Sequence, residues 1–231
     1  RTGLLTTLAL AALDEDGAAT YRFYVEGTAA PAVKVGDVQL PEDLSALAVG
    51  TLGLVLEPAA DATAAAVAAV SDSTLVFVDP NCRPSVINDE QRYRARLDEV
   101  LQRADVVKVS GDDLAYLSPG EDSIMAARGL LDHGVRVVLF TDGGEGVCVI
   151  TPNDEFIVPV PSVEVVDTVG AGDSFGGGFL AFWLSRGLNR SDLGDHEQLR
   201  WAVGRAVTVA AITCNRVGAN PPTLAELAEL D

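Results

Sequence analysis

Residues 74–83 read Thr-Leu-Val-Phe-Val-Asp-Pro-Asn-Cys-Arg, an apolar run that ends abruptly in polar residues and a proline. A short apolar run bounded by turn residues is typical of a strand buried on both faces. Similar runs predict strands at residues 46–49, 74–78, 106–109 and 135–141. Helical patterns lie between them, at residues 61–70, 90–103 and 123–133. This alternation predicts an α/β fold with a mainly parallel central sheet.

Two hairpins flank this core. Residues 6–13 and 18–25 are predicted to form the arms of the first, joined by Asp-Glu-Asp-Gly, whose Asp-Gly end favours a hairpin turn. Its aromatic arm, residues 21–24, is more simply interpreted as a packed face, although a flap over a ligand fits too. The second hairpin is predicted from residues 146–151 and 155–160, with its turn at 152–154. The remaining helices are predicted at residues 173–185, 198–213 and 224–230.

Polar or glycine-rich clusters follow three of the predicted strands. They occupy residues 79–83, 110–113 and 141–144. In open parallel sheets, the ligand crevice lies outside the carboxyl ends of the strands. We therefore expect the three clusters to converge on one binding site.

Composition narrows the classes of partner. The 231 residues are 48% hydrophobic and carry a formal net charge of −18, which disfavours binding to nucleic acid or to anionic membranes. An anionic ligand such as a nucleotide would need a local positive feature or a magnesium ion. The three cysteines show no disulfide or zinc spacing, and no apolar run is long enough to span a bilayer. These features predict a cytoplasmic, soluble protein.

Residues 166–178, Val-Asp-Thr-Val-Gly-Ala-Gly-Asp-Ser-Phe-Gly-Gly-Gly, carry the most specific chemical signal. A glycine turn leads into an apolar helical run, so the backbone N–H groups of residues 170–173 are predicted to lie unpaired at a helix N-terminus. Such amides and the positive end of the helix dipole attract phosphate. Asp173 would face the same crevice, where a carboxylate can take the proton of an attacking hydroxyl. The pattern suits phosphoryl transfer.

This stretch allows other interpretations. Asp173 could simply cap a tight turn, the usual outcome for an isolated glycine-rich turn. A dinucleotide-binding fingerprint requires GxGxxG, whereas the spacing here is GxGxxxG. A serine hydrolase built on Ser174 would lack the Gly-x-Ser-x-Gly elbow, and His133 and His196 are the only histidines. The absence of Gly-Lys-Ser/Thr excludes a P-loop.

The run Asp-Thr-Val-Gly-Ala-Gly-Asp at residues 167–173 resembles the signature of ribokinase-like, pfkB-type carbohydrate kinases. The resemblance extends through residues 79–84, 141–146 and 214–219, covers nearly the whole chain, and points most directly to bacterial fructokinases. It implies a three-layer ribokinase-like fold, with residues 1–30 as a β lid and residues 31–231 as the nucleotide-binding and catalytic domain. Lid hairpins in this family often pair two subunits, so the resemblance also implies a homodimer through the lid.

The resemblance assigns roles to individual positions. Asp173 matches the catalytic base, and the amides of Gly170, Ala171 and Gly172 match the anion hole. The nucleotide pocket would be lined by Thr141, Gly143 and Gly146. Asn81 and Arg83 would face the phosphates or the acceptor, although Arg83 could instead be a surface residue.

Metal ions are implied as well. ATP would bind together with Mg²⁺, and many relatives bind K⁺ beside the anion hole. The groups matching that K⁺ site are Asp167 and the carbonyls of Val169, Thr213, Arg216 and Gly218. Asp167 could equally cap the turn that follows it. Where many relatives carry Asn-x-x-Glu, this chain has Ser110-Gly111-Asp112-Asp113, so Asp113 would act on Mg²⁺ through water while Ser110 cannot replace the amide.

The expected activity is ATP-dependent phosphorylation of a sugar hydroxymethyl group, as in fructokinases. The alternatives are a 2-keto-3-deoxygluconate kinase, another small-molecule kinase of the family and, from a different class, a non-catalytic nucleotide or sugar sensor. Compared with the family, the sequence begins at the lid hairpin and lacks roughly the first third. The sugar-gripping aspartate of relatives lies in that part, so it has no counterpart here.

Overall fold

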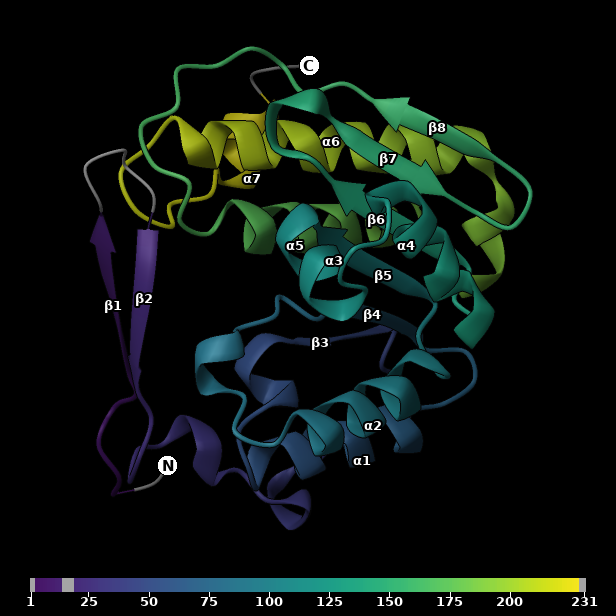
Figure 1. The fold of residues 1–231 in the computed structure, drawn as a ribbon. Coiled ribbons are helices and arrows are strands. Elements are labelled where there is room, and N and C mark those ends of the chain that lie inside the picture. Colours follow the sequence, from purple (N-terminus) through teal and green to yellow (C-terminus); the bar gives the residue numbers. More distant parts are fainter. Residues whose placement is uncertain (1–2, 14–18, 229–231) are drawn as a thin grey trace.

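The computed structural model describes residues 3–13 and 19–228 and contains two separate sheets (Figure 1). Strands β1 (Leu8–Leu13) and β2 (Ala19–Tyr24) form an antiparallel pair that stands beside the rest of the molecule. The larger sheet has six strands in the order β3-β4-β5-β6-β7-β8. The prediction of an α/β fold with a mainly parallel sheet is confirmed.

Pairing in the larger sheet follows from the connections between its strands. The strands are β3 (Ala46–Gly50), β4 (Leu75–Asp79), β5 (Val106–Ser110), β6 (Val137–Thr141), β7 (Val147–Ile150) and β8 (Glu155–Val158). Helical crossovers connect β3 to β4, β4 to β5 and β5 to β6, so these four strands run parallel to one another. Short turns link β6 to β7 and β7 to β8, which makes both of these pairs antiparallel.

Helices cover both faces of the sheet. They are α1 (Ala59–Ala69), α2 (Glu90–Leu101), α3 (Gly111–Leu117), α4 (Ser123–Gly129), α5 (Ala171–Ser185), α6 (His196–Cys214) and α7 (Leu224–Ala228). Short 3-10 segments are η1 (Ala30–Ala32), η2 (Val35–Asp37), η3 (Thr51–Leu54), η4 (Pro84–Val86), η5 (Leu130–His133), η6 (Gly143–Glu145) and η7 (Arg190–Gly194).

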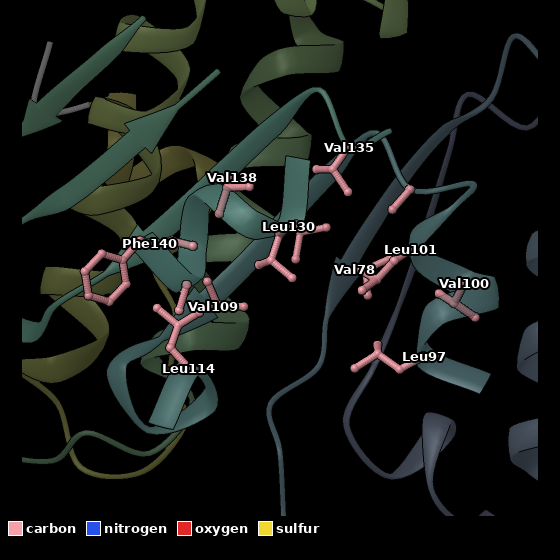
Figure 2. Close-up of a cluster of buried hydrophobic side chains, with 14 of the residues drawn as sticks. Val78, Leu97, Val100, Leu101, Val109, Leu114, Leu130, Val135, Val138 and Phe140 are labelled. Atoms are coloured by element: carbon pink, nitrogen blue, oxygen red, sulfur yellow. The ribbon is translucent and has the colours of Figure 1, made fainter. Parts of the chain in front are cut away.

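Alternating strand residues divide the core into two layers. On β4, Val76 and Val78 face a cluster that includes residues of α1, α2, α3 and α4, and Figure 2 shows part of this layer. Leu75 and Phe77 face the opposite cluster, which includes residues of α5 and α6. β4 is therefore buried on both sides, which explains why its sequence is a continuous apolar run rather than an alternating one.

Most predicted elements are confirmed within a few residues, and one helix was missed. The polar cluster at residues 110–113 begins α3, a helix that the sequence patterns did not predict. Ser110 Oγ accepts a hydrogen bond from the Asp113 amide, and the Asp113 carboxylate accepts one from the Ser110 amide, so the two residues form a capping box. The Ser-x-x-Asp spacing was a recognisable signal for this helix start. The predicted turn at residues 14–17 lies outside the described residues.

The first hairpin carries an exposed apolar face. Leu8 and Tyr24 are direct partners in the β1–β2 ladder, and both are about half exposed, as is Leu10. The packed-face interpretation is therefore wrong for Tyr24, which is 47% exposed.

Among all described residues, no helix has the length and hydropathy needed to cross a bilayer.

A buried carboxylate connects several segments at the amino ends of the parallel strands, on the side of the sheet opposite the predicted site. Asp105, 1% exposed, precedes β5 and accepts a hydrogen bond from the Val76 amide at 2.9 Å. Three guanidinium groups surround it: Arg190 at 2.8 Å, Arg103 at 3.3 Å and Arg136 at 3.7 Å. Removing one partner of such a buried cluster leaves charge without compensation.

We therefore expect Asp105→Asn to lower the free energy of unfolding by about 3 kcal/mol. Urea denaturation would measure this, with Asp98→Asn on the exposed side of α2 as a control that should change stability little. Equal stability of both variants and the wild-type protein would contradict the assigned role.

Candidate active site

The carboxyl ends of neighbouring strands meet at one edge of the sheet, as predicted. Gly50 pairs in register with Asp79, and Ser110 pairs with Thr141. The chain leaves β4, β5 and β6 at Asp79, Ser110 and Thr141, each of which is only partly buried although the preceding strand residues are buried. This edge is the structural basis of the site.

The first turn of α5 is shaped by Gly170. This residue is the N-cap and has φ +78°, in the left-handed region where glycine is strongly preferred. A Cβ atom at this position would lie 2.6 Å from the Cβ atom of Ala219. Only glycine allows the chain to turn here while the segment around Ala219 lies against it. The helix begins two residues earlier than the predicted start at residue 173.

Three of the four predicted amides in this turn have no acceptor. The N–H groups of Gly170, Gly172 and Asp173 donate no hydrogen bond within the described residues. The prediction was wrong for the amide of Ala171, which donates to the Thr168 carbonyl at 3.2 Å because the turn closes on itself. The Asp173 side chain is exposed. Unpaired amides and a carboxylate thus share one helix turn.

A cavity of about 600 Å³ adjoins this turn. It is lined by the predicted nucleotide-pocket residues Thr141, Gly143 and Gly146, together with Ala171 and Gly172 of α5. Valines 147, 160, 163, 165 and 207 make its walls largely apolar. Such a space suits a flat heterocyclic base held mainly by packing, with charged groups directed toward the amides of α5.

Asp167 connects the segment before α5 to the segment that follows α6 through hydrogen bonds to both. Its Oδ1 accepts a hydrogen bond from the Val169 amide at 2.9 Å, and its Oδ2 accepts one from the Gly218 amide at 2.8 Å. The hydrogen bond from Val169, and to a smaller extent the one from Gly218, hold the pKa of the Asp167 carboxyl below its ordinary value. The amides of residues 166 and 167 donate to the Cys214 carbonyl. The interpretation that Asp167 caps the turn that follows it is confirmed.

The groups predicted to bind K⁺ lie around this clamp. Val169 and Gly218 both contact Asp167 through their amides. The Thr213 carbonyl accepts a hydrogen bond from the Arg216 amide at 3.1 Å, and the Gly218 carbonyl accepts one from the Asn220 amide at 2.8 Å. The two segments that carry the five groups are therefore joined, and K⁺ binding by them stays a prediction.

Asn81 and Arg83 follow β4 at the same edge. Asn81 adopts φ +40°, and its Nδ2 donates to Thr51 Oγ1 at 3.1 Å, across to the segment after β3. The Arg83 guanidinium donates to the Cys82 carbonyl at 2.9 Å and to the Asn81 carbonyl at 3.3 Å. Both side chains are partly buried. Their contact with a ligand stays a prediction.

Asp113 is 2% exposed and joins the loop after β4 to the end of β5. Its Oδ1 accepts from the Cys82 amide at 2.6 Å, and its Oδ2 accepts from the Ser110 amide at 2.8 Å and from Ser110 Oγ at 2.6 Å. A carboxylate can accept about four hydrogen bonds, so three of its positions are used. Across residues 3–13 and 19–228, no group of three or more acidic, His or Cys side chains is arranged to bind a metal ion. Mg²⁺ carried by a nucleotide needs only one or two carboxylates and several waters, which fits this edge.

Sequence reasoning missed one charged residue beneath the first turn of α5, Lys108. Lys108 on β5 and Asp79 at the end of β4 form an ion pair, with 3.1 Å between Nζ and Oδ2. A lysine inside an otherwise apolar predicted strand was the available signal, because buried charges are rare unless they are paired.

Comparison with known proteins identifies the family of this chain. The family model described as "pfkB family carbohydrate kinase" matches residues 2–226. A fructokinase of Rhizobium leguminosarum bv. trifolii is 37% identical over 167 residues, which cover 72% of this chain and 51% of that protein. The chain therefore spans about half the length of this relative.

Solved structures show the same fold. A fructokinase of Xylella fastidiosa with bound ATP has a TM-score of 0.88 at 26% identity, covering all of this chain and 74% of that one. A fructokinase double mutant from Vibrio cholerae O395, with fructose, ADP and potassium bound, has a TM-score of 0.84 at 26% identity, covering 96% and 72%. The chain belongs to the pfkB family of carbohydrate kinases.

Proposed function

We propose that this protein transfers the γ-phosphoryl group of ATP to a sugar hydroxymethyl group, with fructose as the first candidate acceptor. The observation that carries the proposal is the shared turn of α5, in which unpaired amides adjoin the exposed carboxylate of Asp173. Similarity to fructokinases, one solved with ATP and another with fructose and ADP, supports the choice of both substrates.

Residue roles follow from this arrangement. Asp173 takes the proton of the acceptor hydroxyl while its oxygen attacks the γ-phosphorus, the bond to the bridging oxygen breaks, and ADP leaves. The amides of Gly170 and Gly172 stabilise charge on the transferring group. The cavity lined by Thr141, Gly143 and Gly146 holds the adenine and ribose. Mg²⁺ bound to ATP would neutralise phosphate charge, and Asp113 would hold one of its waters.

The clamp around Asp167 is the proposed K⁺ site. Asp167 and the carbonyls of Val169, Thr213, Arg216 and Gly218 come from two segments that the clamp joins beside the α5 turn. A cation bound there would add positive charge close to the phosphate. We expect K⁺ to raise the phosphorylation rate above that measured with the same concentration of a bulky quaternary ammonium chloride, and equal rates would contradict this site.

The β1–β2 hairpin, within residues 1–30, is the proposed lid, and residues 31–231 form the catalytic domain. Leu8, Leu10 and Tyr24 give the hairpin an exposed apolar face. Closing this face over the sugar would exclude water and limit ATP hydrolysis. We also propose that two copies of the protein pair through this hairpin.

The test is a panel of acceptors incubated with MgATP: fructose, 2-keto-3-deoxygluconate, ribose, glucose and adenosine. Product is identified by mass spectrometry and ³¹P NMR, and ADP binding is measured by calorimetry. We expect one sugar to be phosphorylated in preference, with fructose first. ADP binding without turnover of any acceptor would overturn the kinase assignment and favour a sensor.

A further inference from the structure

Lysine is rare in this chain, and one of its two lysines is buried. The sequence has sixteen Lys and Arg residues, of which only Lys34 and Lys108 are lysines. Lys34 is exposed, whereas Lys108 is 5% exposed in the middle of β5. Burying an ammonium group is costly unless it is paired, so a lysine at this position requires a specific explanation.

The ammonium group of Lys108 lies directly beneath the first turn of α5. A Cβ atom built on Gly172 would be 3.1 Å from Lys108 Nζ and 3.9 Å from Cε. Gly172 is also one of the residues whose amide has no acceptor. The bare Cα of Gly172 therefore makes room for the ammonium next to the proposed phosphate-binding amides.

Asp79 holds the ammonium at this place. Its Oδ2 and Oδ1 lie 3.1 and 3.4 Å from Nζ, and Asp79 is the only acceptor that Lys108 has among the described residues. An ammonium group has three N–H donors, so this single carboxylate cannot satisfy all of them. Donors remain for a further anion at the first turn of α5.

The side chains around this site are mostly carboxylates, so Lys108 is needed to favour the binding of an anion there. Burial raises the pKa of Asp79, Lys108 lowers it in part, and the carboxylates of Asp113 and Asp173 raise it further. Asp79, the partner of Lys108, thus lies within electrostatic range of two further carboxylates at this edge. Without Lys108, a phosphoryl group entering the α5 turn would meet uncompensated negative charge.

We propose that Lys108 is a phosphate-binding catalytic residue, whose ammonium contacts the transferring phosphoryl group while Asp79 positions it. The inference rests on the proposed kinase function and adds a side-chain cation to the backbone amides of α5. Lysine suits the position because its compact ammonium fits under Gly172, whereas the planar guanidinium of arginine is larger.

The scarcity of lysine allows a direct test in the wild-type protein. With ¹⁵N-labelled lysine, the side-chain Nζ spectrum should contain only two signals, which Lys108→Met and Lys34→Met assign. Addition of inorganic phosphate, and separately of ADP with Mg²⁺, should shift the Lys108 signal and leave the Lys34 signal unchanged. Calorimetry on the same samples measures ADP affinity.

Kinetics supply the second measurement. Lys108→Met should lower kcat by about 10²-fold, as removal of one oxyanion donor does, while the KM for the sugar changes little. Lys34→Met should leave kcat unchanged. If ADP binds but the Lys108 signal stays in place and Lys108→Met keeps the wild-type kcat, this inference is overturned while the proposed function stands. If wild-type protein fails to bind ADP, the proposed function fails, and this inference fails with it.

Discussion

Asp173→Asn is expected to lower kcat for sugar phosphorylation by about 10²- to 10⁴-fold, the range supplied by a positioned general base. The asparagine amide has the same shape but cannot take the proton of the acceptor hydroxyl. Because the amides of Gly170 and Gly172 belong to the backbone, ADP affinity should stay within about threefold of wild type. Coupled-enzyme assays and calorimetry measure the two quantities.

Loss of ADP binding by Asp173→Asn would show that the substitution damaged the site, and its rate would then say nothing about proton transfer. Asp112, the second residue of α3, is also exposed and provides a matched control for the loss of charge. Asp112→Asn also removes one negative charge near the strand ends. Wild-type turnover by Asp173→Asn would show that the base assignment is wrong.

Gly170→Ala is expected to impair both folding stability and catalysis. The left-handed conformation at φ +78° costs a residue with a side chain about 1 to 3 kcal/mol. The added methyl group would also lie 2.6 Å from Ala219 Cβ, so the segment after α6 must move away from the α5 turn. We expect a lower melting temperature and at least a tenfold loss of kcat/KM for ATP.

Gly177, on the exposed side of the same helix, is the control for this substitution. A Cβ atom there meets nothing within 4 Å, so Gly177→Ala should raise the stability by about 0.5 to 1 kcal/mol through helix propensity. If Gly170→Ala behaved like Gly177→Ala in thermal denaturation and kinetics, the tight turn would not be the feature that shapes the site.

Much of the fold could be predicted because local patterns agree with the tertiary arrangement. The run at residues 75–78 is apolar at every position, and both faces of β4 are in fact buried. Polar residues at the strand ends predicted where the site lies, since parallel strands carry their carboxyl ends to the same edge. The helix that begins after Gly170 was visible from the change from glycine to an apolar periodic pattern.

Other features depend on contacts that a linear pattern does not reveal. The Ala171 amide finds the Thr168 carbonyl only because of the angle at which the turn closes. Lys108 and Asp79 are 29 positions apart, and their pairing beneath Gly172 requires the sheet register and the place of α5 over it. Tyr24 was expected to pack because aromatic residues usually do, yet the hairpin stands away from the main core (Figure 1).

The central claim concerns the amides at the start of α5, and ¹⁵N NMR of the glycine-labelled protein tests it most directly. Titration with a non-hydrolysable ATP analogue and Mg²⁺ should move the amide protons of Gly170 and Gly172 downfield, as hydrogen bonds to phosphate form, while Gly177 stays in place. Saturating binding of the analogue with unchanged signals for both Gly170 and Gly172 would contradict the account.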